Sequence, residues 1–235
     1  MNRVKRAIIM AAGKGNRMHP ITQKIPKPLV KVNGVRMIDS VIKALNDNGI
    51  YEIYVVVGYL KEQFKDLEGV TLIENPYYDS CNNISSLYVA RDYIADAFIL
   101  DGDQMIYDSS ILRPEFELSG YNSVWTDEHT DEWLMQIEDG VVKSCSRNGG
   151  EEGYILYSVS RWSEEDAQKL KKHLEIEFEE KQNRQIYWDD VAMFCYFDEY
   201  KLGIYEMKRD AIVEIDSFDE LVSIDNTYAD WRKES

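Results

Sequence analysis

The sequence predicts an α/β fold, in which a mixed, mostly parallel β-sheet is flanked by helices and carries a small inserted β-lobe. Apolar runs that alternate with helical patterns occupy the first half of the 235 residues, which is typical of parallel βαβ units. Short strand-like segments separated by glycines occupy the middle of the chain. No repeat, low-complexity tract or linker divides the two parts, so we expect one domain.

In the first half, short apolar runs predict buried strands, and apolar residues at helical spacing predict helices between them. The expected strands cover residues 7–10, 53–57, 70–73 and 97–101. The expected helices cover residues 37–48, 61–67 and 85–93, and a shorter extended piece lies at 30–33. In such a sheet, ligands bind beyond the carboxyl ends of the strands.

The second half predicts the inserted lobe and then returns to helices. We expect strands at residues 123–125, 133–137, 141–144 and 154–157, and a further strand at 212–216. Ser163, a good N-cap, precedes a charged amphipathic helix that runs to about residue 181. A last helix is expected from Ser217 to about Ile224.

Composition excludes several classes of function. The net charge of −16 argues against nucleic acid or an anionic membrane as a partner, and no apolar run approaches the ~18 residues of a membrane span. Three widely spaced cysteines form neither a zinc motif nor a disulfide framework, and no secretory signal is evident, so we expect a cytoplasmic protein. Residues 1–38 nevertheless carry nine Lys and Arg and no acid, which indicates a small polyanionic ligand.

The clearest feature is the segment 7–29, A-I-I-M-A-A-G-K-G-N-R-M-H-P-I-T-Q-K-I-P-K-P-L. A buried strand leads into a basic loop in which Gly13 and Gly15 let backbone N–H groups approach an anion. Three prolines prevent the loop from forming a helix. Neither a Walker-type loop nor the G-x-G-x-x-G dinucleotide fingerprint is present. The segment therefore predicts a phosphate-binding loop of another kind.

This loop resembles the signature of nucleotidyltransferases that join a nucleoside triphosphate to a phosphorylated small molecule. The matching residues are A-A-G-K-G-N-R (11–17), P-I-T (20–22) and P-K-P-L (26–29). Four further strings resemble the bacterial CTP:phosphocholine cytidylyltransferases, which are related to the sugar-1-phosphate nucleotidyltransferases. They are V-G-Y-L-K-E-Q-F (57–64), E-W (132–133), Y-W-D (187–189) and V-E-I-D (213–216). The resemblance spans nearly the whole chain and implies a Rossmann-like nucleotidyltransferase domain.

The resemblance implies a nucleotide-binding part at about residues 1–120 and an acceptor-binding part at about 121–235. The expected nucleotide-binding residues are Ala11, Ala12, Gly13, Lys14, Gly15, Asn16, Arg17, Lys27, Gly58, Tyr59, Asn83, Ser85, Ser86 and Asp101. We expect at least one of Asn83, Ser85 and Ser86 to contact the base, although good helix N-caps would also explain them. The role of Lys14 stays open.

Carboxylates at the ends of two strands predict a metal site. Asp101 and Asp103 lie one residue apart after a buried strand, a pattern that suits Mg²⁺, and a simple turn is the alternative. The resemblance implies that Asp103 and Asp216 hold Mg²⁺. Lys27, Arg17 and Asp103 are then the catalytic residues: Lys27 bridges the reacting phosphates and Arg17 holds the leaving pyrophosphate.

Aromatic and acidic side chains predict the acceptor site. The resemblance implies that Trp133 and Tyr187 flank a trimethylammonium group and that Asp189 balances its charge, with Glu214 nearby. The expected substrates are CTP and phosphocholine, with CDP-choline and pyrophosphate as products.

Three alternatives remain open from the sequence. The pair Asp189-Asp190 also suits a primary amine, as in 2-aminoethylphosphonate or phosphoethanolamine. A sugar-1-phosphate is less expected, because the segment 82–87 reads N-N-I-S-S-L instead of a glycine-rich string. A non-catalytic nucleotide-sensing module is disfavoured by the presence of Lys27 and the metal acids.

Overall fold

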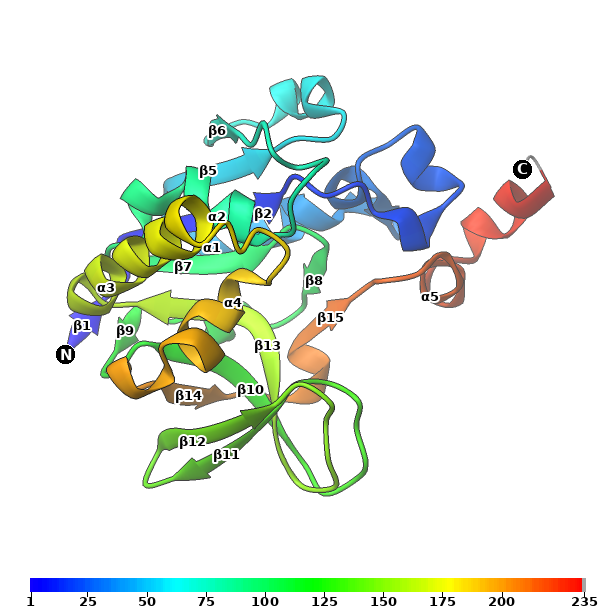
Figure 1. The fold of residues 1–235 in the computed structure, drawn as a ribbon. Coiled ribbons are helices and arrows are strands. Elements are labelled where there is room, and N and C mark those ends of the chain that lie inside the picture. Colours follow the sequence, from blue (N-terminus) through cyan, green and yellow to red (C-terminus); the bar gives the residue numbers. More distant parts are fainter. Residues whose placement is uncertain (234–235) are drawn as a thin grey trace.

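The computed structural model describes residues 1–233, and a nine-stranded mixed sheet forms its centre (Figure 1). The strands follow the order β10-β14-β12-β11-β13-β7-β2-β5-β6. Their bounds are β2 Arg6–Ala11, β5 Glu52–Val57, β6 Thr71–Glu74, β7 Ala97–Asp101, β10 Gly120–Thr126, β11 Leu134–Glu138, β12 Val141–Ser146, β13 Gly153–Trp162 and β14 Gly203–Glu206. The predicted mixed α/β sheet is confirmed.

The four strands β7, β2, β5 and β6 are mutually parallel, as the alternation of strands and helices predicts. Their side chains alternate between two cores, because successive residues of a strand point to opposite faces. Ile9 packs with residues of helix α1 (Met37–Asp47), whereas Ile8 packs with residues of α2 (Ile84–Val89) and α3 (Glu164–Glu175). Helices therefore cover both faces of this part of the sheet (Figure 1).

The predicted β-lobe is present, but its strands continue the central sheet. β13 pairs antiparallel with β10 along one edge; along its other edge it pairs antiparallel with β11 near its start and with β7 near its end. It runs from Gly153 to Trp162, well beyond the predicted 154–157, because buried Val159 and Trp162 extend its apolar pattern into the main core. The acceptor-side strands are thus attached directly to the nucleotide-side strands.

Three predicted helices differ from the structure. The helix expected at 85–93 ends at Val89, where the Ala90 N–H bonds to Leu87 O and tightens the last turn, and a 3₁₀ turn follows at Arg91–Tyr93. The helix expected at 163–181 continues after α3 as a π-helix over Ile176–Glu180. The segment expected as a helix at 61–67 is a 3₁₀ helix over Lys61–Asp66.

Short paired strands and a C-terminal helix complete the site's frame. The pairs are β1 (Asn2–Arg3) with β9 (Glu115–Phe116), β3 (Lys31–Val32) with β4 (Val35–Arg36), and β8 (Gln104–Ile106) with β15 (Ile212–Glu214). After β15, helix α5 (Phe218–Ile224) begins with a capping box between Ser217 and Glu220. Met18 and Ile21 of the glycine loop share a buried cluster with Phe218 and Leu221, so α5 anchors that loop. No helix among the described residues is long and apolar enough to cross a membrane.

Candidate active site

The glycine loop lines a cavity of about 310 Å³ beyond the carboxyl end of β2. Its lining residues are Met10, Ala11, Gly13, Gly15, Asn16, Arg17, Lys27, Pro28, Asp103 and Asp216. The structure therefore brings the predicted phosphate-binding residues and the two predicted metal acids around one space. Ala12 and Lys14 do not line this cavity, and Lys14 instead forms an ion pair with Asp79.

The loop's backbone positions Lys27. Gly15 has φ of 64°, a left-handed conformation that favours glycine. A Cβ at this position would lie 3.0 Å from Lys27 Cβ and 3.1 Å from Thr22 Cγ2. Thr22 Oγ1 donates a hydrogen bond to Gly15 O at 2.8 Å. Gly15 therefore allows both the turn and the close packing against Lys27.

Lys27 lies between two carboxylates that are far apart in sequence. Its Nζ lies 2.5 Å from Asp103 Oδ2 and 2.8 Å from Asp216 Oδ1, and the residue is only 7% exposed. Burial by itself lowers the pKa of Lys27, but the charges and hydrogen bonds of Asp103 and Asp216 outweigh it and hold the pKa above its ordinary value. The ammonium group is therefore charged at neutral pH.

Arg17 borders the same cavity from the solvent side. Its Nη2 lies 2.8 Å from Asp216 Oδ1, while 71% of its side chain is exposed. An exposed ion pair of this kind is weak, so the guanidinium can exchange Asp216 for a phosphate group. The position suits the predicted role on the leaving pyrophosphate.

Three carboxylates crowd together beside Lys27. Ligand oxygens of Asp101, Asp103 and Glu214 all lie within 4.8 Å of one another. Burial and the charge of Asp103 raise the pKa of Asp101 to about 7. Burial of its inner side and the charges of Asp103 and Asp101 raise the pKa of Glu214 to about 9, although part of that side chain reaches solvent. Asp103 Oδ1 is buried without a hydrogen bond.

This arrangement refines the expected metal site. An unpartnered carboxylate oxygen among crowded acids is what an oxygen-coordinated cation such as Mg²⁺ would satisfy. The acids that meet are Asp101, Asp103 and Glu214, whereas Asp216 is occupied by Lys27 and Arg17. Sequence reasoning placed Glu214 with the acceptor and Asp101 with the nucleotide; the pairing of β15 with β8 is what brings Glu214 to Asp103.

The predicted base-contacting residues are bonded within the protein. Asn75, which directly follows β6, donates from Nδ2 to Ser85 Oγ at 3.0 Å and to Ser86 Oγ at 3.1 Å. Asn83 Oδ1 accepts the Trp188 N–H at 2.8 Å. These bonds hold α2 in place and join it to the acceptor side. Sequence reasoning missed Asn75, although a polar residue after a strand end was a usable signal.

Gly58 and Tyr59, also expected near the nucleotide, join β5 to the glycine loop. The Tyr59 N–H donates to Ala12 O at 3.0 Å. A Cβ on Gly58 would lie 2.7 Å from Tyr78 Cβ, so glycine is required by close packing here. Both residues therefore support the loop from the neighbouring strand.

The expected acceptor residues form an aromatic corner. Trp133 and Tyr187 have ring centroids 6.0 Å apart at an interplanar angle of 89°, and Phe194 meets Trp133 at 5.2 Å and 82°. Arg147, which sequence reasoning missed together with Phe194, places its guanidinium carbon 3.4 Å from the Phe194 centroid and 5.7 Å from that of Trp133. A cation of the protein thus already lies on this corner.

Asp189 follows Tyr187 by two residues and lies in α4 (Trp188–Asp190). Its side chain is buried, and neither Asp189 Oδ1 nor Tyr121 Oη forms a hydrogen bond of regular geometry. Burial, and then the charge of Asp101, raise the pKa of Asp189 well above its usual value. The Asp189 carboxyl group therefore feels the charge of Asp101 at the end of β7.

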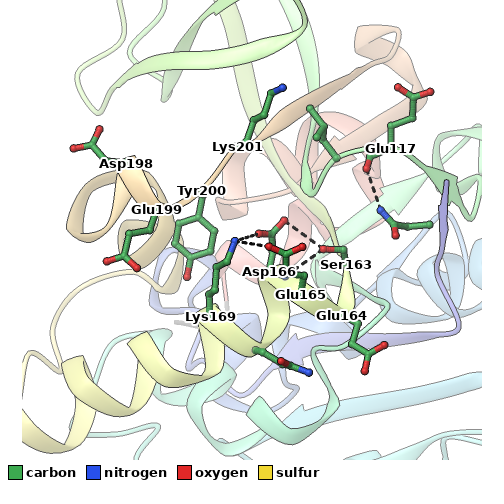
Figure 2. A pocket seen from close by; sticks show the side chains of 13 residues that line it. Glu117, Ser163, Glu164, Glu165, Asp166, Lys169, Asp198, Glu199, Tyr200 and Lys201 are labelled. Carbon is green, nitrogen blue, oxygen red and sulfur yellow. Dashed lines mark hydrogen bonds and ion pairs between the residues drawn. The ribbon is translucent and has the colours of Figure 1, made fainter.

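A larger hollow of about 710 Å³ lies at the N-terminus of α3, and Figure 2 shows its side chains. None of the predicted site residues lines it. Its acids are compensated within the cluster, because Lys169 pairs with Glu165 and Asp166 and Ser163 bonds to Asp166. A lining rich in carboxylates repels phosphates, so this hollow is not the nucleotide site.

A glycine loop, a buried lysine and crowded strand-end acids around one cavity fit a nucleotidyltransferase, and the family model supports that class. The chain belongs to the MobA-like NTP transferase family, whose domain model matches residues 7–161.

Relatives that match nearly the full length of this chain are named cytidylyltransferases. The 2-aminoethylphosphonate cytidylyltransferase of Lancefieldella rimae is 40% identical over 94% of this chain and 92% of its own. The choline-phosphate cytidylyltransferase of Streptococcus pneumoniae is 33% identical over 90% of this chain and 93% of its own. A solved structure of the S. pneumoniae CTP:phosphocholine cytidylyltransferase superposes with a TM-score of 0.88 at 32% identity, covering 96% of this chain and 99% of that one. The resemblance stated from the sequence is confirmed.

Proposed function

We propose that the protein transfers a cytidylyl group from CTP to a small acceptor and releases pyrophosphate. The acceptor carries a phosphate or phosphonate at one end and a positively charged amine at the other. The observation that carries the proposal is Lys27, held between Asp103 and Asp216 at the edge of the glycine-loop cavity. The cytidylyltransferase names of the full-length relatives support CTP as the nucleotide.

In the proposed reaction, an acceptor oxygen attacks the α-phosphorus of CTP in line, and the bond to pyrophosphate breaks. The attacking oxygen is already anionic, so no side-chain nucleophile or general base is required. Lys27 bridges the α-phosphate and the acceptor phosphate, where negative charge gathers as the groups approach. Arg17 and the backbone of residues 13–15 hold the leaving pyrophosphate. Catalysis then consists of positioning and charge neutralisation.

A divalent cation, Mg²⁺, completes this proposal. The acids that would suit the cation are the clustered Asp101, Asp103 and Glu214. The buried Asp103 Oδ1, which has no hydrogen bond, also fits a metal ligand. We propose that Asp103, Asp101 and Glu214 would hold the cation, and that Asp216, the second ligand expected from the sequence, lies close enough to Lys27 to contribute to the same site. When bound, the cation supplies positive charge to phosphate oxygens.

Two acceptor substrates fit this proposal, and different observations favour each. The perpendicular rings of Trp133 and Tyr187 favour phosphocholine, since aromatic faces attract a quaternary ammonium group. The buried Asp189 and the 40% identical relative favour 2-aminoethylphosphonate. In both cases the part of the chain before about residue 120 binds CTP and the remainder binds the acceptor.

Pyrophosphate release tests the proposal. The protein is supplied with Mg²⁺ and with CTP, UTP or ATP, and each nucleotide is combined with phosphocholine, 2-aminoethylphosphonate, phosphoethanolamine or glucose-1-phosphate. We expect release with CTP and at least one amine-bearing acceptor. Pyrophosphate release only with glucose-1-phosphate, or no release with any of the four acceptors, would contradict the proposal.

A further inference from the structure

We propose that Arg147 is the residue that determines which amine the acceptor site takes, and that it selects a primary ammonium over a trimethylammonium group. This inference rests on the proposed cytidylyl transfer. Arg147 directly follows β12, in the segment that connects it to β13. Its guanidinium reaches the aromatic corner of Trp133, Tyr187 and Phe194.

The position of Arg147 is held by a buried carboxylate. Its Nε lies 2.8 Å from Asp190 Oδ1, its Nη2 contacts the same oxygen, and the Asp190 side chain is only 5% exposed. The other oxygen of Asp190 accepts the Tyr187 N–H at 2.8 Å. One carboxylate therefore fixes both the arginine and the backbone of the tyrosine. An ion pair with a buried partner keeps its geometry better than an exposed one.

The arginine occupies aromatic surface that a quaternary ammonium group would need. Its guanidinium carbon lies 3.4 Å from the Phe194 centroid and 5.7 Å from the Trp133 centroid, so Phe194 is covered and Trp133 is partly shared. A trimethylammonium group binds by contact with several ring faces and has no N–H to donate. At this corner a trimethylammonium group meets fewer free ring faces, whereas the positive charge of Arg147 acts on any ammonium group alike.

A primary ammonium group can instead form hydrogen bonds with the acceptor oxygens of Asp189 and Tyr121. The Asp189 carboxylate is buried beside Tyr121 Oη, and neither Asp189 Oδ1 nor Tyr121 Oη forms a hydrogen bond of regular geometry, so their mutual contact leaves both poorly satisfied. Leaving such atoms unpaired is costly, and a donor that reaches them recovers that cost. A primary ammonium has three N–H donors and a quaternary one has none. The site chemistry therefore matches an ω-amino phosphate or phosphonate with a primary amine.

The test compares acceptor selectivity in four proteins: wild type, Arg147→Ala, Arg147→Gln and Lys143→Ala. Lys143 is an exposed lysine on the same strand β12, paired with Glu138, so its removal controls for loss of one positive charge. For each protein, kcat/KM is measured by pyrophosphate release with CTP and either 2-aminoethylphosphonate or phosphocholine. Melting curves establish that each variant is folded, and the glutamine variant serves if the alanine variant is not.

We expect the wild type and Lys143→Ala to prefer 2-aminoethylphosphonate. We expect the ratio of the two kcat/KM values to fall about tenfold in the Arg147 variants, mainly through better use of phosphocholine. A wild-type preference for phosphocholine, or an unchanged ratio in a folded Arg147 variant, would overturn the role of Arg147 while leaving cytidylyl transfer intact. Absence of pyrophosphate release with every acceptor would instead contradict the proposed function itself.

Discussion

Lys27 Nζ lies 2.5 Å from Asp103 Oδ2, although the two residues are 76 positions apart in the sequence. The contact joins the glycine loop after β2 to the end of β7, two neighbouring parallel strands. It places Lys27, the proposed catalytic cation, directly beside the acids proposed to hold Mg²⁺. The pair therefore links the proposed phosphate-binding and metal-binding halves of the site.

Replacing Lys27 tests its proposed role on the reacting phosphates. Lys27→Met should lower kcat by about a hundredfold to a thousandfold and change the KM for CTP much less, because the charge acts most strongly where negative charge gathers. Steady-state kinetics measure both. Lys31→Met, at an exposed lysine on β3, is the matched control and should retain activity. A higher KM for CTP with an unchanged kcat would contradict the proposed role of Lys27.

Gly15→Ala tests whether the loop backbone positions Lys27. The added Cβ would lie 3.0 Å from Lys27 Cβ, and the left-handed backbone would cost about 1–2 kcal/mol. We expect a lower melting temperature and a fall in kcat/KM. Gly140→Ala, at a glycine with φ of 74° and no atoms within 4 Å of the added Cβ, separates backbone strain from crowding of the lysine. Equal activity loss in both variants would argue against the packing explanation.

The crowded acids predict an opposition between stability and activity. The pKa of Glu214 is raised from 4.5 to about 9, so the folded protein holds a proton that the unfolded chain releases. Without metal, stability should therefore fall as pH rises through this window. Glu214→Gln removes that loss of stability, so its melting temperature should exceed that of the wild type by an amount that grows with pH. A difference of 1 kcal/mol in the free energy of unfolding corresponds to about 2–4 °C.

Mg²⁺ should stabilise the wild type more than Glu214→Gln, and the variant should turn over more slowly. Thermal melts with and without Mg²⁺ across pH 4.5 to about 9 measure this. A variant that is less stable than the wild type at high pH, in the absence of metal, would show that the carboxylates do not repel each other there.

Asn83 tests how the nucleotide and acceptor sides are joined. Its Oδ1 accepts the N–H of Trp188, and the Asn82 N–H likewise donates to Arg184 O at 2.8 Å, so the start of α2 supports the segment that carries Tyr187 and Asp189. Asn83→Ala should raise the KM for the acceptor about tenfold through loss of one buried hydrogen bond. Asn83→Asp, which keeps the accepting oxygen, should restore it. An increase confined to the KM for CTP would support base contact instead.

The sequence alone predicts the parallel half of the sheet and the glycine loop, because their signals are local. Residues 7–29 contain both the strand and its loop, so apolar runs, glycines and prolines suffice. Where local signals compete with tertiary packing, prediction is weaker. The extension of β13 to Trp162 depends on pairing with β7, which sequence spacing does not reveal.

The site residues likewise fall into those that local motifs predict and those that only the fold reveals. Lys27, Asp103 and Asp216 follow from motifs, and the structure brings them together. Arg147 and Phe194 lie in segments without a motif, and only the fold shows that one stacks on the other. The partners of Asn83, Ser85 and Ser86 also come from outside their own segment, so the sequence could not decide between structural and base-contacting roles.

The most direct test of cytidylyl transfer is a ³¹P NMR spectrum of the reaction products. CTP and Mg²⁺ are incubated with equal amounts of 2-aminoethylphosphonate and phosphocholine. We predict loss of the triphosphate signals of CTP, appearance of pyrophosphate, and a new phosphonate resonance coupled to the α-phosphorus of the cytidylyl group. Formation of CDP and orthophosphate, with both acceptors unchanged, would contradict attack at the α-phosphorus and with it the proposed function.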